Sequence, residues 1–434
     1  MKTKLLTFII ALIMITSSAT KAELYLDGFL QGLYGGRLDK DNPTNTEYTA
    51  SETRLQLRTE HFSDKGEFFG RMDFTYDGSE DPEYDVELRE GYLKFRLGSK
   101  LDFKVGRQVL TWGTGDLIFI NDVFAKDYQS FFVGRDDQYL KAPQNALRME
   151  YYNNIGTFSV VWTPRFTPNR LPTGVRLSYY LPPMPDGIGG MTPGGFAGTG
   201  LGDQFYFDPP KPEATFGNSE IATRFQRQIG GFNTALYFYK GFYKNPRGFD
   251  PATMMPYYPR LNLYGASLRG AKFGGVLWLE GGYLDSRDDT EGDNPYAPNS
   301  TVTGMVGFER QVATNLTANI QWQVDYMLDY DKFEAQQLPM LQVMPDYYYR
   351  DEVRHLLTSR VTKLLKAETV TLSGFVFYSP TDEDVYFRFS TEYKYTDEIT
   401  LTFGGNIFDG NHPNTDYAQF ALNDNLYAKM TYGF

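Results

Sequence analysis

Residues 315–328 read "NLTANIQWQVDYML", and this stretch alternates between apolar and polar side chains. Every second residue from Leu316 to Tyr326 is apolar, and five polar residues fill the positions between them. Alternation with a period of two predicts a β-strand with one apolar and one polar face. Strands in soluble sheets are typically about 5–6 residues long, whereas about ten residues are needed to cross a membrane as a tilted strand. The stretch therefore predicts one strand of a membrane β-barrel.

The same alternation recurs along the chain and predicts eighteen strands. The predicted strands are 24–37, 52–62, 67–77, 86–98, 101–112, 144–153, 155–163, 219–228, 231–243, 260–271, 274–285, 301–312, 314–330, 352–365, 367–379, 385–396, 398–409 and 425–434. Connections after the even-numbered strands are tight, and those after the odd-numbered strands are long. We therefore predict an all-β fold, a single transmembrane antiparallel β-barrel with short periplasmic turns and long extracellular loops.

The C-terminal stretch "NLYAKMTYGF" (425–434) ends on an aromatic residue. Chain ends of soluble domains are usually poorly ordered, but here Met430, Tyr432 and Phe434 continue an apolar alternation to the last residue. The last strand must close the barrel against the first. We predict that Tyr432 and Phe434 form the signal by which the outer-membrane barrel assembly machinery recognises the chain.

Residues 1–22 have the pattern of a secretory signal peptide. A basic start and an eleven-residue apolar run precede small residues that end at Ala22. The run is too short to span a bilayer as a helix. We predict cleavage after Ala22, which leaves residues 23–434 as a single barrel in the outer membrane of a Gram-negative bacterium.

The composition excludes several kinds of chemistry. The chain of 434 residues has a net charge of −12 and no cysteine, so disulfides, thiolate metal sites and thiol catalysis are excluded. Its three histidines, His61, His355 and His412, show no metal-ligand spacing, and no catalytic or phosphate-binding motif occurs. His355 is the one candidate for the base of a barrel lipase, on the lipid-facing parity of its strand. We predict a protein that is not an enzyme and needs no metal or cofactor, with no nucleic-acid partner.

Two long connections are candidates for a constriction of the barrel. Residues 113–143 are rich in apolar and aromatic side chains, and 164–218 are rich in proline and glycine. Loops of this length are usually functional or disordered. We predict that at least one of them folds into the lumen. The acidic stretches 77–85 and 285–295 predict an outer surface that meets lipopolysaccharide through divalent ions.

Charged side chains alternate onto the inward faces of the second to eighth strands. The basic residues are Arg54, Arg58, Arg71, Lys94, Arg96, Lys104, Arg148 and Arg224. The acidic residues are Glu52, Glu60, Asp73, Glu90, Asp102, Glu150 and Glu220. This near balance predicts cross-strand ion pairs. Because arginine offers a fork of donors to carboxylate and phosphate groups, we also predict a weak anion preference. The residues expected to set it are Arg54, Arg58, Arg71 and Arg96.

The register of the first predicted hairpin with a tight turn has two solutions. A turn centred on residues 64–65 places Arg58 opposite Arg71, and a turn centred on 65–66 places Arg58 opposite Asp73. Like charges directly opposite one another are destabilising. We therefore predict the second register.

The segment "VGRQVLTWGTGDLIFINDVF" (105–124) resembles part of the alginate-export type of outer-membrane porin. The residues that carry the resemblance are Gly106, Arg107, Gln108, Trp112, Gly113 and Asp116. It implies an eighteen-stranded barrel with an arginine-containing lumen that passes anionic solutes. Apolar residues follow Asp116 where the family pattern has basic ones, so polyuronate export is not carried over. The alternative is that Trp112 is an interfacial girdle residue and Gly113 a turn residue.

The predicted function is a channel for small hydrophilic, anionic solutes across the outer membrane. Two alternatives stay open: an export channel for an anionic polysaccharide, and a structural barrel that houses a periplasmic partner protein. A monomer and a trimer are both compatible with the sequence.

Overall fold

The structure is a computed structural model that describes residues 25–39, 41–44, 46–80, 82–181, 195–197, 209–253, 255–343 and 347–434. The predicted signal peptide, residues 1–22, lies outside the described residues, and so does a large part of the long connection 164–218. Within the described residues the chain forms one large sheet of 18 strands.

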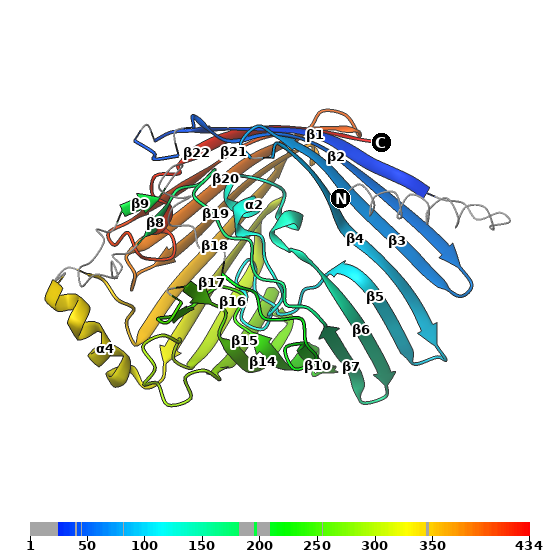
Figure 1. Ribbon diagram of the computed structural model, residues 1–434. Coiled ribbons are helices and arrows are strands. Elements are labelled where there is room, and N and C mark those ends of the chain that lie inside the picture. The colour runs from blue at the N-terminus through cyan, green and yellow to red at the C-terminus, as the bar shows by residue number, and fades with distance from the viewer. Residues whose placement is uncertain are drawn as a thin grey trace.

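The sheet is antiparallel and closed, which confirms the predicted fold class. Its strands are β1 (Tyr25–Arg37), β2 (Tyr48–Ser63), β3 (Gly66–Asp77), β4 (Tyr84–Leu97), β5 (Leu101–Val109), β6 (Pro143–Asn153), β7 (Gly156–Thr163), β10 (Glu220–Ile229), β11 (Phe232–Phe242), β14 (Arg260–Lys272), β15 (Gly275–Ser286), β16 (Thr301–Ala313), β17 (Leu316–Met327), β18 (Val353–Leu365), β19 (Val370–Ser379), β20 (Asp384–Lys394), β21 (Ile399–Gly410) and β22 (Asn425–Gly433). Each strand pairs with its sequence neighbours, and β1 also pairs with β22. Figure 1 shows the resulting barrel.

The two chain ends of the barrel meet where it closes. The Phe434 amide donates to the Gly28 carbonyl at 3.0 Å, and the Gly28 amide donates to the Phe434 carbonyl at 3.1 Å. The last residue therefore continues the hydrogen bonding between β22 and β1. Its side chain is 51% exposed, as expected of an outward-facing residue in a barrel wall.

The alternation in residues 315–328 matches the two faces of β17. Ile320 is 57% exposed and Trp322 is 47% exposed, whereas Gln321 between them is 1% exposed. The apolar side chains thus lie on the outer surface and the polar ones inside. An outer surface of this kind is stable against lipid, which removes the apolar side chains from water.

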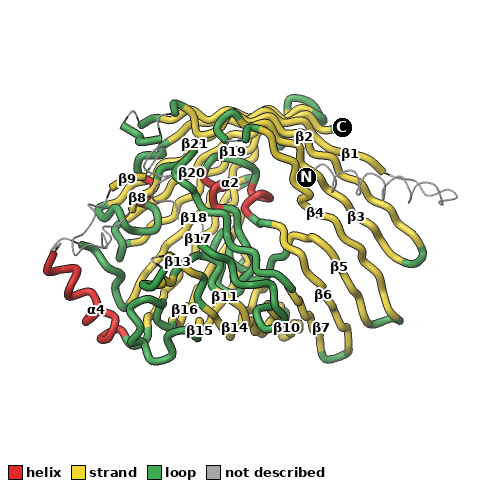
Figure 2. The backbone as a smooth tube through the Cα atoms, in the orientation of Figure 1, coloured by secondary structure: helices red, strands yellow, loops and turns green. Residues whose placement is uncertain are grey.

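The remaining elements are short or lie at the rim. They are the helices α2 (Tyr128–Phe132) and α4 (Tyr330–Val343), the 3₁₀ turns η1 (Asp137–Leu140) and η2 (Ala418–Phe420), and the small hairpins β8 (Tyr179–Leu181) with β9 (Gly195–Ala197) and β12 (Gly248–Asp250) with β13 (Met255–Tyr257). No helix in the described part of the chain has the length and apolar character to cross a bilayer. Figure 2 shows α4 at the outer edge, and loops and α2 surrounded by the strands.

Candidate functional site

The lumen contains residues 110–142, which link β5 to β6 and are called the inward segment below. The strand ends that it joins are paired, Val109 with Pro143, so the segment leaves and returns at one place in the wall. Figure 1 shows this segment, including α2, inside the barrel. Its polar contacts reach strands on several sides of the lumen.

The first part of the inward segment is bound to β15 through one carboxylate. Glu280 is 4% exposed. Its Oε2 accepts from the Thr114 amide at 2.6 Å and the Thr114 hydroxyl at 2.7 Å, and its Oε1 accepts from the Asn121 amide at 2.8 Å. A buried carboxylate is costly unless hydrogen bonds satisfy it. Glu280 therefore fixes the course of the segment while its own charge is compensated.

Ion pairs near both ends of the inward segment join it to the wall. Its acidic residues face bases on β18, β20 and β22. The pairs are Asp116 with Arg360 at 2.9 Å, Asp137 with Arg388 at 3.0 Å, and Asp136 with Lys429. The signs are reversed at β2, where Arg135 Nε donates to Glu52 at 2.8 Å. Charge complementarity therefore orients the segment in the lumen.

Tyr139 in η1 is held between two guanidinium groups of the wall. Arg54 lies 4.3 Å and Arg89 lies 4.2 Å from the centre of its ring, an arrangement that favours both cations. The Tyr139 hydroxyl donates to Asp73 at 3.0 Å and accepts from Gln56 at 3.0 Å. Burial raises the pKa of Tyr139 above its ordinary value, so the phenol stays neutral.

The opposite side of the inward segment packs through aromatic rings. Phe132 of α2 lies 5.4 Å from Tyr386, 5.3 Å from Phe408 and 4.9 Å from Phe420, measured between ring centroids. Phe131 adds a T-shaped contact with Tyr386 at 5.8 Å. Both phenylalanines are at most 6% exposed. This aromatic cluster fills the lumen next to β20 and β21.

A buried lysine stabilises the turn that precedes α2. Lys126 is 2% exposed, forms an ion pair with Asp122 at 3.0 Å and donates to the Phe124 carbonyl at 2.7 Å. Burial lowers the pKa of Lys126, and the charge of Asp122 opposes this shift. The Asp127 side chain then accepts from the Ser130 amide at 2.8 Å and caps the N-terminus of α2.

The residues of the family-like motif have structural roles at the start of the inward segment. Gly106 has φ +134°, and a Cβ there would lie 2.3 Å from the Gly91 carbonyl oxygen, so only glycine fits. Gln108 is fully buried and donates to the Ala146 carbonyl at 3.0 Å. Arg107 forms an ion pair with Glu87 at 3.0 Å.

Trp112 lies inside the barrel and not in an interfacial girdle. It is 8% exposed and packs edge-on against Phe124, with ring centroids 5.1 Å apart. Gly113 has φ +82°, and a Cβ there would lie 2.9 Å from Glu280. The girdle alternative for Trp112 is therefore wrong, whereas Gly113 does need the conformational freedom of glycine at a bend.

The predicted register of the β2–β3 hairpin is wrong. The structure pairs Arg58 with Arg71, not with Asp73. Repulsion is avoided because each guanidinium contacts a carboxylate on another strand. Arg58 lies 2.9 Å from Asp27 on β1, and Arg71 contacts Glu90 on β4. The prediction considered two strands, whereas the charge balance involves four.

A β-bulge in β4 adds a residue that the alternation missed. Arg71 pairs with Glu90 and Met72 pairs with Leu88, so Arg89 is the extra residue. Arg89 is 1% exposed and donates to the Gln138 carbonyl and, at 3.0 Å, to the Lys141 carbonyl. Sequence reasoning also missed Arg135 and Tyr139. The only local signal is that a polar run, residues 135–138, interrupts a segment rich in apolar side chains.

The other predicted lumen residues lie nearer the short-turn end of the barrel. Their contacts are Lys94 with Glu67 at 3.4 Å, Arg96 with Asp102 at 2.5 Å, Arg148 with Glu150 at 2.6 Å, Lys104 over the Tyr92 ring at 3.7 Å, and Arg224 over the Trp112 ring at 5.1 Å. Of these, the pairs of Lys94 and Arg96 join neighbouring strands as predicted, whereas Arg148 and Glu150 both lie on β6. Arg54, in contrast, is 5% exposed beneath the inward segment and is paired with Glu52 and Asp73.

The candidate for a lipase base lies on the outer surface. His355 Nδ1 accepts from the Trp322 indole at 3.3 Å, and the two rings are stacked. The Ser379 hydroxyl contacts the His355 backbone and not its imidazole. Across the described ranges, no group of three His, Asp or Glu side chains has the geometry to hold a metal ion.

Comparison with known proteins supports the fold assignment. The structure is similar to OccD3 (OpdP) of Pseudomonas aeruginosa, with a TM-score of 0.53, 10% identity and 96% of each chain covered. It is also matched by OccK10 (OpdN) of the same species (TM-score 0.49, 11% identity, 96% of this chain and 99% of that chain). A mutant of Rhodopseudomonas blastica porin matches with a TM-score of 0.41 and 9% identity, over 95% of this chain and all of that chain.

At this low sequence identity the similarity shows the fold alone. That fold is similar to the fold of outer-membrane porins. No protein-family model and no curated protein matches the sequence. The resemblance to the alginate-export type therefore stays a prediction.

Proposed function

We propose that this protein is an outer-membrane channel through which small hydrophilic solutes diffuse, with a weak preference for anions. The observation that carries the proposal is a closed barrel with an apolar outer face and a charged lumen. Eighteen strands enclose a lumen wide enough for water and solutes. The inward segment narrows that lumen and thus limits solute size.

The orientation in the membrane follows from the connections. In barrels of this class, short turns face the periplasm and long loops face the outside. The acidic outer loops would meet lipopolysaccharide through divalent ions. Tyr432 and Phe434, at the periplasmic end, would present the assembly signal to the barrel assembly machinery after removal of residues 1–22. Channel activity in this proposal requires no catalytic residue and no cofactor.

The anion preference rests on which partner of each ion pair a solute would meet. Near the short-turn end, Lys94 has 50% of its side chain exposed against 22% for its partner Glu67. Arg96 has 61% exposed against 13% for its partner Asp102. A solute in this part of the lumen therefore meets more basic than acidic surface. The preference is weak because every one of these bases is already paired.

Reversal potentials across a planar bilayer test the proposal. The purified protein should give discrete conductance steps and a reversal potential on the anion side under a salt gradient. Lys94→Gln combined with Arg96→Gln should reduce the anion preference. Lys240→Gln combined with Lys272→Gln removes the same charge from outward positions and should leave it unchanged. Absence of conductance steps, or a cation preference that neither double variant alters, would contradict the proposal.

The two alternatives are less well supported. Export of a polysaccharide chain and housing of a partner protein both need a continuous wide lumen. The inward segment occupies part of that space and is bound to β2, β15, β18, β20 and β22. Passage of small solutes needs only the space left beside it.

A further inference from the structure

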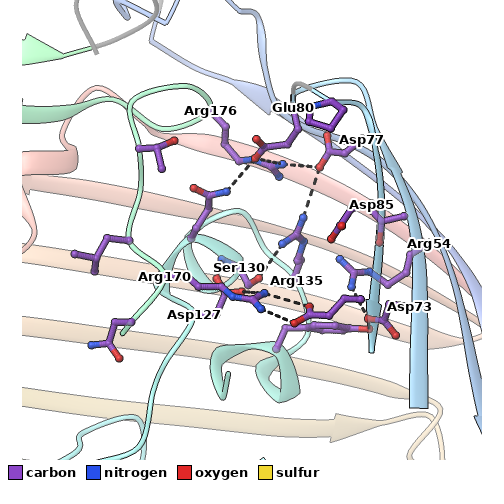
Figure 3. Close-up of a pocket in the computed structure, with 18 of the residues that line it drawn as sticks. Arg54, Asp73, Asp77, Glu80, Asp85, Asp127, Ser130, Arg135, Arg170 and Arg176 are labelled. Atoms are coloured by element: carbon purple, nitrogen blue, oxygen red, sulfur yellow. Dashed lines mark hydrogen bonds and ion pairs between the residues drawn. The ribbon is translucent and has the colours of Figure 1, made fainter. Parts of the chain in front are cut away.

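A pocket of about 480 Å³ opens between the long-loop ends of β3 and β4 and the inward segment. Its volume lies in the range of about 300–1,000 Å³ that is usual for small-molecule sites. Figure 3 shows charged side chains of both signs around it. Seven carboxylates and five basic groups line the pocket, which gives a formal charge of −2.

The arginines of the pocket are already bound to carboxylates. Arg176 contacts Asp77 at 2.6 Å and Glu80 at 2.7 Å, and its side chain is 1% exposed. Arg54 is buried and Arg135 is largely covered, and both are engaged in the ion pairs described above. Arg176, Arg54 and Arg135 therefore form the fixed walls of the pocket and have little surface to offer a ligand.

Arg170 differs from the other arginines because its guanidinium remains accessible. Glu87 and Asp127 hold it, yet 44% of the side chain is exposed. Its backbone is fixed to the inward segment, with its amide donating to the Lys126 carbonyl at 2.8 Å and its carbonyl accepting from the Tyr128 amide at 2.9 Å. Arg170 thus offers a positioned cation with donors for a carboxylate.

Asp85 on β4 supplies the opposite charge. Its side chain is exposed, lines the pocket, and forms no hydrogen bond or ion pair with any described residue. Figure 3 shows Asp85 among the wall residues and Arg170 among the residues of the loop side. A neighbouring acid, Glu83, is engaged by the Tyr76 hydroxyl. Asp85 is therefore the carboxylate most available to a cationic group.

We propose that this pocket binds a small zwitterionic solute, with its carboxylate at Arg170 and its ammonium group at Asp85. The proposal rests on the proposed channel function, because the pocket would then be the first site that a solute meets from the outside. A purely anionic solute would leave Asp85 without a partner and lie in a pocket of net negative charge. A purely cationic solute would lie against the exposed guanidinium of Arg170.

Three probes with the same three-carbon skeleton test the proposal: β-alanine, propionate and propylamine. Saturation-transfer NMR on the full protein in detergent measures their binding without requiring conduction. β-Alanine should bind about tenfold more tightly than either singly charged probe, since a charge-assisted hydrogen bond contributes about that factor. Equal binding of all three probes, or binding of propionate or propylamine as tight as that of β-alanine, would overturn the proposal.

Two variants assign the ends of the ligand. Asp85→Asn should remove the advantage of β-alanine over propionate, and Arg170→Gln should remove its advantage over propylamine. Asp64→Asn, in the short β2–β3 turn at the other end of the barrel, is the matched control and should change neither. If Asp85→Asn and Asp64→Asn behave alike, the assignment is wrong. Heat-dependent gel mobility would verify that each variant folds.

Conductance of the same preparations separates the two proposals. A protein that conducts but shows no preference for β-alanine would overturn the pocket and leave the channel in place. A protein that binds β-alanine as predicted but gives no conductance steps would support the pocket and overturn the channel.

Discussion

The inward segment is held on two sides by different chemistry. Toward β20 and β21, Phe131 and Phe132 pack against aromatic rings, whereas toward β2 and β3, Arg135 and Tyr139 bind charged and polar groups. Aromatic burial contributes most of its free energy through the hydrophobic effect, which is not directional. Hydrogen-bonded ion pairs contribute less net free energy but define one arrangement. The comparison indicates that the aromatic side stabilises the segment and the charged side positions it.

The largest expected effect comes from the aromatic side. Phe132→Ala would leave a cavity between α2, β20 and β21 and should lower the free energy of unfolding by about 3–5 kcal/mol. Urea unfolding in lipid vesicles would measure it. The matched control is Phe216→Ala, because Phe216 is 85% exposed and its loss should cost less than about 0.5 kcal/mol. Equal stability of the two variants would mean that the aromatic cluster does not hold the segment.

The contribution of the charged side to stability can be tested with two glutamates of β2, one covered by the inward segment and one outside it. Glu52 is 4% exposed and binds both Arg54 and Arg135, so Glu52→Gln leaves buried positive charge and should cost about 3 kcal/mol. Glu60→Gln, farther along β2, removes a partly exposed partner of Arg58 and should lower the free energy of unfolding by about 0–1 kcal/mol. The same unfolding assay compares them. A larger loss for Glu60→Gln would show that coverage by the segment does not determine the strength of these pairs.

The smallest expected effect is a pH dependence beside the aromatic cluster. Asp424, in the loop before β22, accepts from the Phe408 amide, and burial raises its pKa to about 6. An acid whose pKa is raised in the folded state favours folding only while it is protonated. Stability should therefore fall by about 1 kcal/mol as pH rises from about 4 to 6, after allowance for solvent screening.

Asp424→Asn keeps the acceptor for the Phe408 amide and should reduce this fall. Asp64→Asn, in an exposed turn, should leave it in place. Unfolding curves of the unaltered protein and of the two variants, measured at several pH values, test this assignment. A fall of the same size in Asp424→Asn as in the unaltered protein would assign the titration to other groups.

The barrel was predictable because its signal is local. Each strand carries its own alternation, as Ile320, Gln321 and Trp322 illustrate, and no distant contact is needed to recognise it. The bulge at Arg89 shifts the alternation by one residue, and the residue types around it give no sign of that shift. Helix α4 was not predicted, because residue 330 was assigned to the end of a strand and 331–343 to a loop.

The contacts of the inward segment were not predictable from the sequence, since they join residues far apart in the chain. Tyr139 lies between Arg54 and Arg89, and no spacing in the sequence relates these three positions. The predicted register of Arg58 was wrong for the same reason, because Asp27 and Glu90 on flanking strands compensate the charges of Arg58 and Arg71. Alternation tells which face a residue occupies but not which partner it has.

The central claim is that the inward segment narrows a conducting barrel, and single-channel conductance tests it most directly. Because Val109 and Pro143 are paired, residues 111–141 can be replaced by a short turn without opening the wall. This variant should fold and conduct, with a conductance raised by about twofold or more. Replacing α4 (330–343) with a short linker is the control and should leave conductance unchanged. An unchanged conductance after removal of 111–141 would contradict the account.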